Sequence, residues 1–363
     1  MYYSKNLPEL SIVIPTYNEK ENIVTLINKL FSIFSLNRIK GEIIIVDDNS
    51  PDGTGLLVEK LRKKYRYLKI IHRKEKMGLS SAILAGFKIA KGNILGAMDA
   101  DMSHPPEAIP IMLNEIKNGA DFVIGSRYIK GGKIIGWPFY RKLISKGATF
   151  LAKIFTEVKD PMSGFFLIKS KCLEGRNINP KGFKICLELL VKANYKSVKE
   201  VPITFTDRQL GKSKLNLKEY YYYLSNLGSY MLYKKIIKKF VKFCIVGAFG
   251  TLLNIAVLYV LTEKLYIFYM ISAVFAFVVA LTSNFILNKI WTFGEKLSER
   301  TLYKYSKFFI ISILALFVNL IVLYILVEYF QIWYIFSQVL AILISSIVNF
   351  FGNAIWTFKG DKK

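Results

Sequence analysis

In residues 1–240, short hydrophobic runs alternate with amphipathic segments. The runs lie at 10–15, 42–46, 68–71, 93–98 and 121–125, and the run at 42–46 consists largely of β-branched residues. Runs of this length predict strands, and the segments between them, such as 78–90, predict helices. This alternation predicts an α/β domain built on a mostly parallel sheet that is covered by helices.

Residues 243–358 show a different pattern, in which long stretches lack charge. These stretches lie at about 243–262, 265–288, 308–327 and 332–356. Each is close to the roughly 20 residues that cross a bilayer as a helix. The sequence therefore predicts two domains: an α/β domain over 1–233 and an all-α transmembrane domain of four helices over 234–363.

The second pair of apolar stretches repeats the first pair. The tetrapeptide Ile-Trp-Thr-Phe at 290–293 recurs at 355–358, an offset of 65 residues. Three asparagines recur at the same offset, as the pairs Asn254 and Asn319, Asn284 and Asn349, and Asn288 and Asn353. A unit of two helices returns to its starting side, so the two repeats are predicted to be parallel. The asparagines either line a pathway or bond between helices.

The formal net charge of +25 points either to nucleic acid or to an anionic membrane surface. The basic residues gather beside the apolar stretches, at 234–242, 289–307 and 359–363. This distribution favours the lipid bilayer as the partner and argues against nucleic acid. Because basic loops stay in the cytoplasm, we expect a multi-pass protein of the cell membrane, with the α/β domain and both termini cytoplasmic.

Two carboxylates follow the predicted strand at 93–98, at the edge where parallel sheets bind ligands. Asp99 and Asp101 are two residues apart, and in an extended segment such residues point to the same side. Both can then hold one hard cation, Mg²⁺ or Mn²⁺, which assists the departure of a nucleotide diphosphate. The alternative is an acidic loop that is simply solvated. His104 is interpreted as a loop residue at a helix start and not as a base.

Other polar groups also follow strands. Residues 15–19 either start a helix or form the rim of a nucleoside site, and residues 47–53 have the composition of a turn. The amphipathic segment 139–155 either lies in the membrane interface or packs against the core. The candidate phosphate ligands are basic residues: Arg127, Arg141, Arg208 and Lys214.

An ordered series of motifs covers residues 8–215. They are PTYNE at 15–19, VDDNSPDGT at 46–54, KMGLSSA at 76–82, MDADMSHPPE at 98–107, GSRY at 125–128, WPFYRKLISKGA at 137–148, DPMSGFF at 160–166 and RQLGKSKL at 208–215. The series resembles the dolichol-phosphate mannose synthases and related polyprenyl-phosphate glycosyltransferases of glycosyltransferase family 2, which have the Rossmann-like GT-A fold. The transmembrane part resembles a GtrA-type domain.

This resemblance implies roles for individual residues. The implied catalytic residues are Asp99, Asp101, Arg127 and Arg208. The implied nucleotide-sugar site comprises Pro15, Tyr17, Glu19, Val46, Asp48, Met98, Asp99, Ala100, Arg127, Lys184, Arg208 and Lys214. The metal would be held by Asp99, Asp101 and Ser103. The lipid phosphate would be placed by Arg127, Arg141 and Ser145.

The resemblance further implies an activity. A single mannose would pass from GDP-mannose to dolichyl or polyprenyl phosphate, with inversion and with a divalent metal, on the cytoplasmic leaflet. Two alternatives stay open at this point. One is a glucosyltransferase that uses UDP-glucose and polyprenyl phosphate, and the other is a flippase for lipid-linked sugars.

Overall fold

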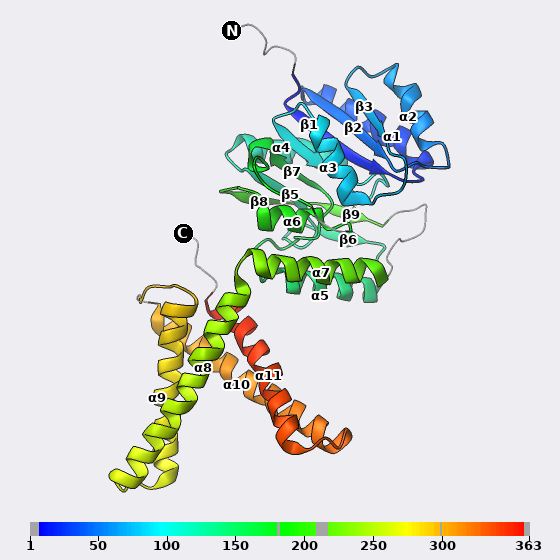
Figure 1. Ribbon diagram of the computed structural model, residues 1–363. Coiled ribbons are helices and arrows are strands. Elements are labelled where there is room, and N and C mark those ends of the chain that lie inside the picture. Colours follow the sequence, from blue (N-terminus) through cyan, green and yellow to red (C-terminus); the bar gives the residue numbers. More distant parts are fainter. Residues whose placement is uncertain (1–6, 180–181, 208–216, 298–299, 359–363) are drawn as a thin grey trace. The chain divides into compact units, whose positions relative to one another are not determined.

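The computed structural model describes residues 7–179, 182–207, 217–297 and 300–358. It divides into two compact units, Met1–Tyr230 and Met231–Lys363 (Figure 1). The division falls inside helix α7 (Leu217–Tyr233), close to the predicted domain boundary. Each unit is described by itself below.

The N-terminal unit is built on a seven-stranded sheet with the order β3-β2-β1-β4-β7-β5-β8. The strands are β1 (Leu10–Thr16), β2 (Gly41–Asp47), β3 (Leu68–His72), β4 (Ile94–Ala97), β5 (Phe122–Ser126), β7 (Phe166–Lys169) and β8 (Val198–Pro202). Four of the six strand pairings are parallel, as the sequence predicts. The exception is β7, which lies between β4 and β5 and is antiparallel to both. A second, two-stranded sheet pairs β6 (Lys133–Ile135) with β9 (Thr204–Thr206).

Helices cover both faces of the large sheet (Figure 1). Isoleucines and leucines of α1 (Lys20–Leu36) and α4 (Ile109–Lys117) pack on one face, together with Val58 of α2 (Thr54–Arg62). The other face is covered by α3 (Leu79–Ile89) and α6 (Ile185–Lys192). Because successive residues of a strand point to opposite faces, Ile12 and Ile14 of β1 enter the first core and Val13 enters the second. The unit is therefore a three-layer α/β/α domain.

Two amphipathic helices pack beside this domain. α5 (Phe139–Ala152) buries only Thr149 and Ala152, while α7 contributes Tyr223, Leu227 and Tyr230 to a shared cluster with α6. The Tyr223 hydroxyl donates a hydrogen bond to the carbonyl oxygen of Ala148 at 2.7 Å. The opposite sides expose large apolar residues: Phe139, Tyr140, Leu143 and Phe150 on α5, and Tyr221 and Leu224 on α7.

The C-terminal unit consists of four helices that are long and apolar enough to cross a membrane: Ile236–Lys264, Tyr269–Thr292, Thr301–Tyr329 and Tyr334–Thr357. They are the α-helices α8 (Ile236–Tyr259), α9 (Tyr269–Leu287), α10 (Thr301–Tyr324) and α11 (Tyr334–Gly352), each extended by one π-helical turn. α8 and α10 begin before the predicted apolar stretches, because their first turns carry lysines. Every bound of the second pair lies 65 residues after the matching bound of the first. A parallel relation between the two pairs stays a prediction.

Polar residues of this unit contact neighbouring helices. The Asn284 side chain of α9 packs on Gly250 of α8, where an added Cβ would lie only 2.2 Å from its Oδ1. The Gln338 amide of α11 donates to Asn319 Oδ1 of α10 at 3.4 Å. The Asn319 contact fits the interhelical interpretation. Asn284 Oδ1 has no hydrogen-bond partner among the described residues, and Asn288 and Asn353 bond within their own helices, to Thr292 and Asn349.

Candidate active site

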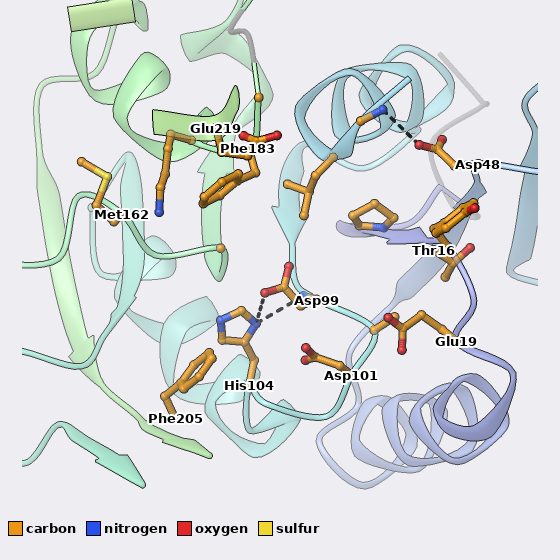
Figure 2. Close-up of a pocket in the computed structure, with 18 of the residues that line it drawn as sticks. Thr16, Glu19, Asp48, Asp99, Asp101, His104, Met162, Phe183, Phe205 and Glu219 are labelled. Carbon is orange, nitrogen blue, oxygen red and sulfur yellow. Dashed lines mark hydrogen bonds and ion pairs between the residues drawn. The ribbon is translucent and has the colours of Figure 1, made fainter. Parts of the chain in front are cut away.

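A cavity of about 450 Å³ opens at the carboxyl ends of β1, β2 and β4. Residues that follow these strands line it, including Thr16, Asp48 and Asp99 (Figure 2). The second half of the unit closes it with residues far along the chain, such as Phe183 and Phe205. The cavity therefore lies where ligands bind in open α/β sheets.

Asp99 and Asp101 both line the cavity, and Figure 2 shows both carboxylates at its floor. The Oδ1 atom of Asp101 accepts hydrogen bonds from the Ser103 hydroxyl at 2.5 Å and from the Ser103 backbone N–H at 3.1 Å. Met102 adopts a positive φ of 61° between these residues, which turns the loop back on itself. Ser103 thus holds Asp101 in place.

His104 supports the backbone of Asp99, and this role was missed in the sequence. Its Nδ1 accepts a hydrogen bond from the Asp99 backbone N–H at 3.2 Å, which places the ring proton on Nε2. Burial lowers the pKa of His104, so the ring is neutral. The ring packs against Phe165 and Phe205, with centroids 5.4 Å and 5.3 Å away. His104 is therefore a buried support for the Asp99 loop. It lies in a loop just before the helix at Pro106–Ala108, which agrees with the interpretation as a loop residue at a helix start; its burial was not predicted.

The carboxylates suit a hard divalent cation in part. Oxygen ligands are those that Mg²⁺ and Mn²⁺ prefer, and Gly164 leaves room beside Asp99, since a Cβ there would lie 3.2 Å from both carboxylate oxygens. In the described parts of the chain, no group of three or more His, Cys, Asp or Glu side chains is arranged to hold a metal ion. The predicted third ligand, Ser103, is buried and does not line the cavity. A bound cation would take its remaining ligands from substrate oxygens and water.

Of the residues predicted to bind the nucleotide sugar, Pro15, Tyr17, Glu19, Asp48 and Ala100 line the cavity, and their roles stay a prediction. The ammonium of Lys76 lies 4.0 Å from the centroid of the Tyr17 ring. Two predicted residues are placed elsewhere.

Val46 and Met98 are fully buried in the core and do not line the cavity. They belong to the sequence motifs, but the side chains of Val46, in β2, and Met98, directly after β4, pack in the hydrophobic core.

Arg73 is a second residue that the sequence did not reveal. Its guanidinium pairs with Asp48 and also donates to the Ser81 hydroxyl and the Gly78 carbonyl oxygen. The Gly78 backbone N–H donates to the other oxygen of Asp48 at 3.1 Å. Arg73 directly follows β3, so the sequence could have indicated its position at the ligand edge of the sheet. The sequence could not have indicated its pairing with Asp48.

On the phosphate side, the cavity is lined by Arg127, Arg141 and Lys184. Arg127 is buried and donates from Nε and a terminal nitrogen to the two oxygens of Asp160, each at 2.7 Å. Arg141 donates to Asp207 at 2.9 Å. Arg127 is thus fixed along one edge by a carboxylate, whereas Arg141 is held through one terminal nitrogen.

Ser145 does not line the cavity, and its hydroxyl accepts a hydrogen bond from Tyr128 at 2.8 Å. The predicted residues Arg208 and Lys214 lie outside the described residues.

Comparison with known proteins agrees with this geometry. The family model for glycosyl transferase family 2 matches residues 11–175, and the one for the GtrA/DPMS transmembrane domain matches residues 242–358. The dolichol-phosphate mannosyltransferase of Pyrococcus furiosus is 42% identical over 349 residues, which cover 95% of this chain and 98% of that protein. This chain belongs to the dolichol-phosphate mannosyltransferase family.

Relatives of the same name occur in fungi. The Saccharomyces cerevisiae protein is 43% identical over 236 residues, covering 62% of this chain and 88% of that protein. The Mycosarcoma maydis protein is 41% identical over 233 residues, covering 62% and 79%. The chain is thus a glycosyltransferase with a GT-A domain and a multi-pass membrane domain, and the predicted fold class is confirmed.

We expect Lys184 to make phosphate binding in this site dependent on pH. Burial, together with the charge of Arg127, lowers the pKa of Lys184 to about 8. Its positive charge is therefore present at pH 7 and lost as the pH rises through 8. If Lys184 binds a donor phosphate, we expect the KM for the nucleotide sugar to rise about tenfold from pH 7 to pH 9, because about nine-tenths of the ammonium is then neutral.

The matched control is Lys184→Arg, since arginine stays charged throughout this range. Steady-state kinetics across pH 6.5–9.5 check the expectation for both forms. A Lys184→Arg enzyme with the same rise in KM as the wild type would assign the pH dependence to another group.

Proposed function

We propose that the enzyme transfers one mannose from GDP-mannose to dolichyl or another polyprenyl phosphate, with inversion at the anomeric carbon. The observation that carries the proposal is the 42% identity to a dolichol-phosphate mannosyltransferase over nearly the full length of both chains. The cavity supports it, because it combines two carboxylates at a strand end with three basic residues that suit phosphates.

The chemistry requires one bond to form and one to break. An oxygen of the acceptor phosphate attacks the anomeric carbon, and the bond from that carbon to the nucleoside diphosphate breaks with its electron pair going to the departing oxygen. A phosphate monoester is largely ionised at neutral pH, so the attacking oxygen needs no general base. This agrees with His104, which is buried with its Nδ1 already occupied.

The residues of the chain act by placing charge. Arg127 and Arg141 would hold the acceptor phosphate, and Lys184 would hold the donor diphosphate, with Arg208 and Lys214 as further predicted phosphate ligands. Asp99 and Asp101 would hold Mg²⁺ or Mn²⁺, which supplies Lewis-acid stabilisation of the diphosphate as it leaves. Positioning and charge stabilisation then account for most of the rate.

The nucleoside would lie against the residues that follow β1 and β2. Pro15, Tyr17 and Glu19 form one rim of the cavity, and Asp48 is held rigidly by Arg73 and Gly78. A fixed carboxylate at this position suits a hydrogen bond from a ribose or base. Val46 and Met98 would support this rim from the core behind it.

A substrate panel tests the proposal on the purified full-length enzyme in detergent. We expect labelled mannose to pass from GDP-mannose to a polyprenyl phosphate, with no transfer to the matching unphosphorylated polyprenol, because the phosphate oxygen is the nucleophile. We also expect EDTA to abolish transfer and Mn²⁺ or Mg²⁺ to restore it. Faster turnover of UDP-glucose would establish the glucosyltransferase alternative, and no turnover of any nucleotide sugar would favour the flippase.

We also propose an orientation in the membrane. The lysines of the first turns of α8 and α10, among them Lys238, Lys239 and Lys304, place the N-terminal ends of these helices in the cytoplasm. The domain over 1–233 is then cytoplasmic, and the exposed apolar sides of α5 and α7 suit contact with the membrane interface.

Labelling in intact cells checks this orientation. A cysteine introduced at exposed Tyr266, in the turn between α8 and α9, should react with an impermeant maleimide, whereas one at exposed Leu297 should react only after lysis. The reverse pattern would contradict the proposed topology.

A further inference from the structure

Trp137 lines the cavity, and its ring lies close to the guanidinium groups of Arg127 and Arg141. The residue lies two positions after the end of β6 and two positions before the start of α5. Its ring centroid is 4.3 Å from the guanidinium carbon of Arg141 and 5.3 Å from that of Arg127. Both distances lie within the range in which an aromatic ring attracts a cation.

Each arginine is held by a carboxylate and also lies near the Trp137 ring. Asp160 accepts from two nitrogens of Arg127, whereas Asp207 accepts through both oxygens from one terminal nitrogen of Arg141. The rings of Tyr128 and Phe205 also lie 5.4 Å from the guanidinium carbon of Arg127. Among the described residues, the Trp137 ring is the one that lies within this range of both arginines, which are 14 positions apart in sequence.

The indole N–H group of Trp137 does not explain why a tryptophan occupies this position. Its Nε1–H is buried and has no hydrogen-bond partner among the described residues. A buried N–H group without a partner is a cost to stability, so the gain must come from the ring itself. Phe205 supports the ring in an edge-to-face arrangement at 5.4 Å.

We propose that Trp137 is a positioning residue for the acceptor phosphate. Its ring sets the distance and direction between Arg127 and Arg141, so that the two guanidinium groups reach two oxygens of one phosphate monoester together. The inference rests on the proposed function in one respect, namely that the acceptor is a polyprenyl phosphate. It assigns no part of the bond-making step to Trp137.

The test measures binding of a short-chain polyprenyl phosphate to the full-length protein in detergent, without donor. We expect Trp137→Leu to weaken this binding about tenfold, and Trp137→Phe to weaken it about threefold, because phenylalanine keeps a ring of weaker cation attraction. Binding of GDP-mannose, which serves as the internal control, should change by less than about twofold. Equal losses for both ligands would mean a general structural role and would overturn the proposal.

A double-mutant cycle with Arg141 separates positioning from direct contact. If Trp137 acts through the arginines, Trp137→Leu should weaken phosphate binding much less in the Arg141→Ala background than in the wild type. Strictly multiplicative effects of the two substitutions would overturn the proposal.

A second series of variants at position 137 keeps the shape of the tryptophan side chain and so avoids misfolding. Site-specific replacement of Trp137 by tryptophans with one to four ring fluorines progressively weakens the attraction of the ring for a cation at nearly constant volume. We expect phosphate affinity to fall stepwise along the series, and a flat series would overturn the proposal. The experiment measures binding and not transfer. If the wild type binds the lipid phosphate but transfers a sugar other than mannose, that result refutes the proposed function alone, and the binding series still tests the role of Trp137.

Discussion

Asp101→Asn is expected to lower the rate of sugar transfer by at least about 10³-fold while leaving the protein folded. Lewis-acid stabilisation of a departing diphosphate contributes several kcal/mol, and each ~1.4 kcal/mol corresponds to tenfold in rate. The substitution removes the charge that would hold the cation. It keeps an oxygen that can still accept the two hydrogen bonds from Ser103.

The measurement combines transfer rates at saturating Mn²⁺ with a thermal melt of the same preparation. Glu21→Gln is a suitable control, because this carboxylate is exposed on α1 and does not line the cavity. It should retain wild-type activity. Turnover of Asp101→Asn within about tenfold of the wild type would remove the metal-binding role from this carboxylate.

Asp160→Ala is expected to destabilise the N-terminal unit by about 3–5 kcal/mol, because it leaves the guanidinium of Arg127 buried without its partner. Asp160 is fully buried and accepts three hydrogen bonds from Arg127, two from the side chain and one from the backbone N–H. For a unit of this size the loss corresponds to a fall in Tm of roughly 6–20 °C.

The double variant Asp160→Ala/Arg127→Met provides the matched control. It removes both charges and replaces the guanidinium with a flexible apolar chain, so most of the lost stability should return. Transfer activity should stay low in both variants, since Arg127 is absent or misplaced. The measurement compares the melting curves of the two variants. If the double variant is as unstable as Asp160→Ala, the ion pair is not the source of the lost stability.

Five strands of the large sheet, β1 to β5, were predictable from the sequence because they depend on local patterns, whereas β8, which is parallel to β5, was not predicted. Strands β1 and β2 are rich in β-branched residues, and the intervening helices place apolar residues at helical spacing. β7 was not predicted, because a run of four residues carries little periodicity. Its position between β4 and β5 also depends on distant pairing, since its partner β4 lies some 70 residues earlier in the chain. The three-residue strands β6 and β9 were missed for the same reason.

The candidate site was predictable to the extent that strand ends reveal it. Asp99, Asp101 and Asp48 follow strands and line the cavity. The supporting contacts were not predictable, because Arg73 and Asp160 acquire their roles from partners 25 and 33 residues away. His104 has its partner close by, but its burial depends on Phe205, a hundred residues later in the chain.

The late position of Phe165 and Phe205 has a consequence for how the protein is made. The carboxylate loop leaves the ribosome long before the two rings that pack on His104, and before the strand β7 that borders β4. At a synthesis rate of ~5–20 residues per second, the loop waits for roughly 5–20 seconds until Phe205 is added. Strands β1, β2 and β3 can pair during that interval, whereas the pocket cannot close. We therefore expect a nascent chain stalled before residue 200 to be compact but unable to retain a nucleotide sugar.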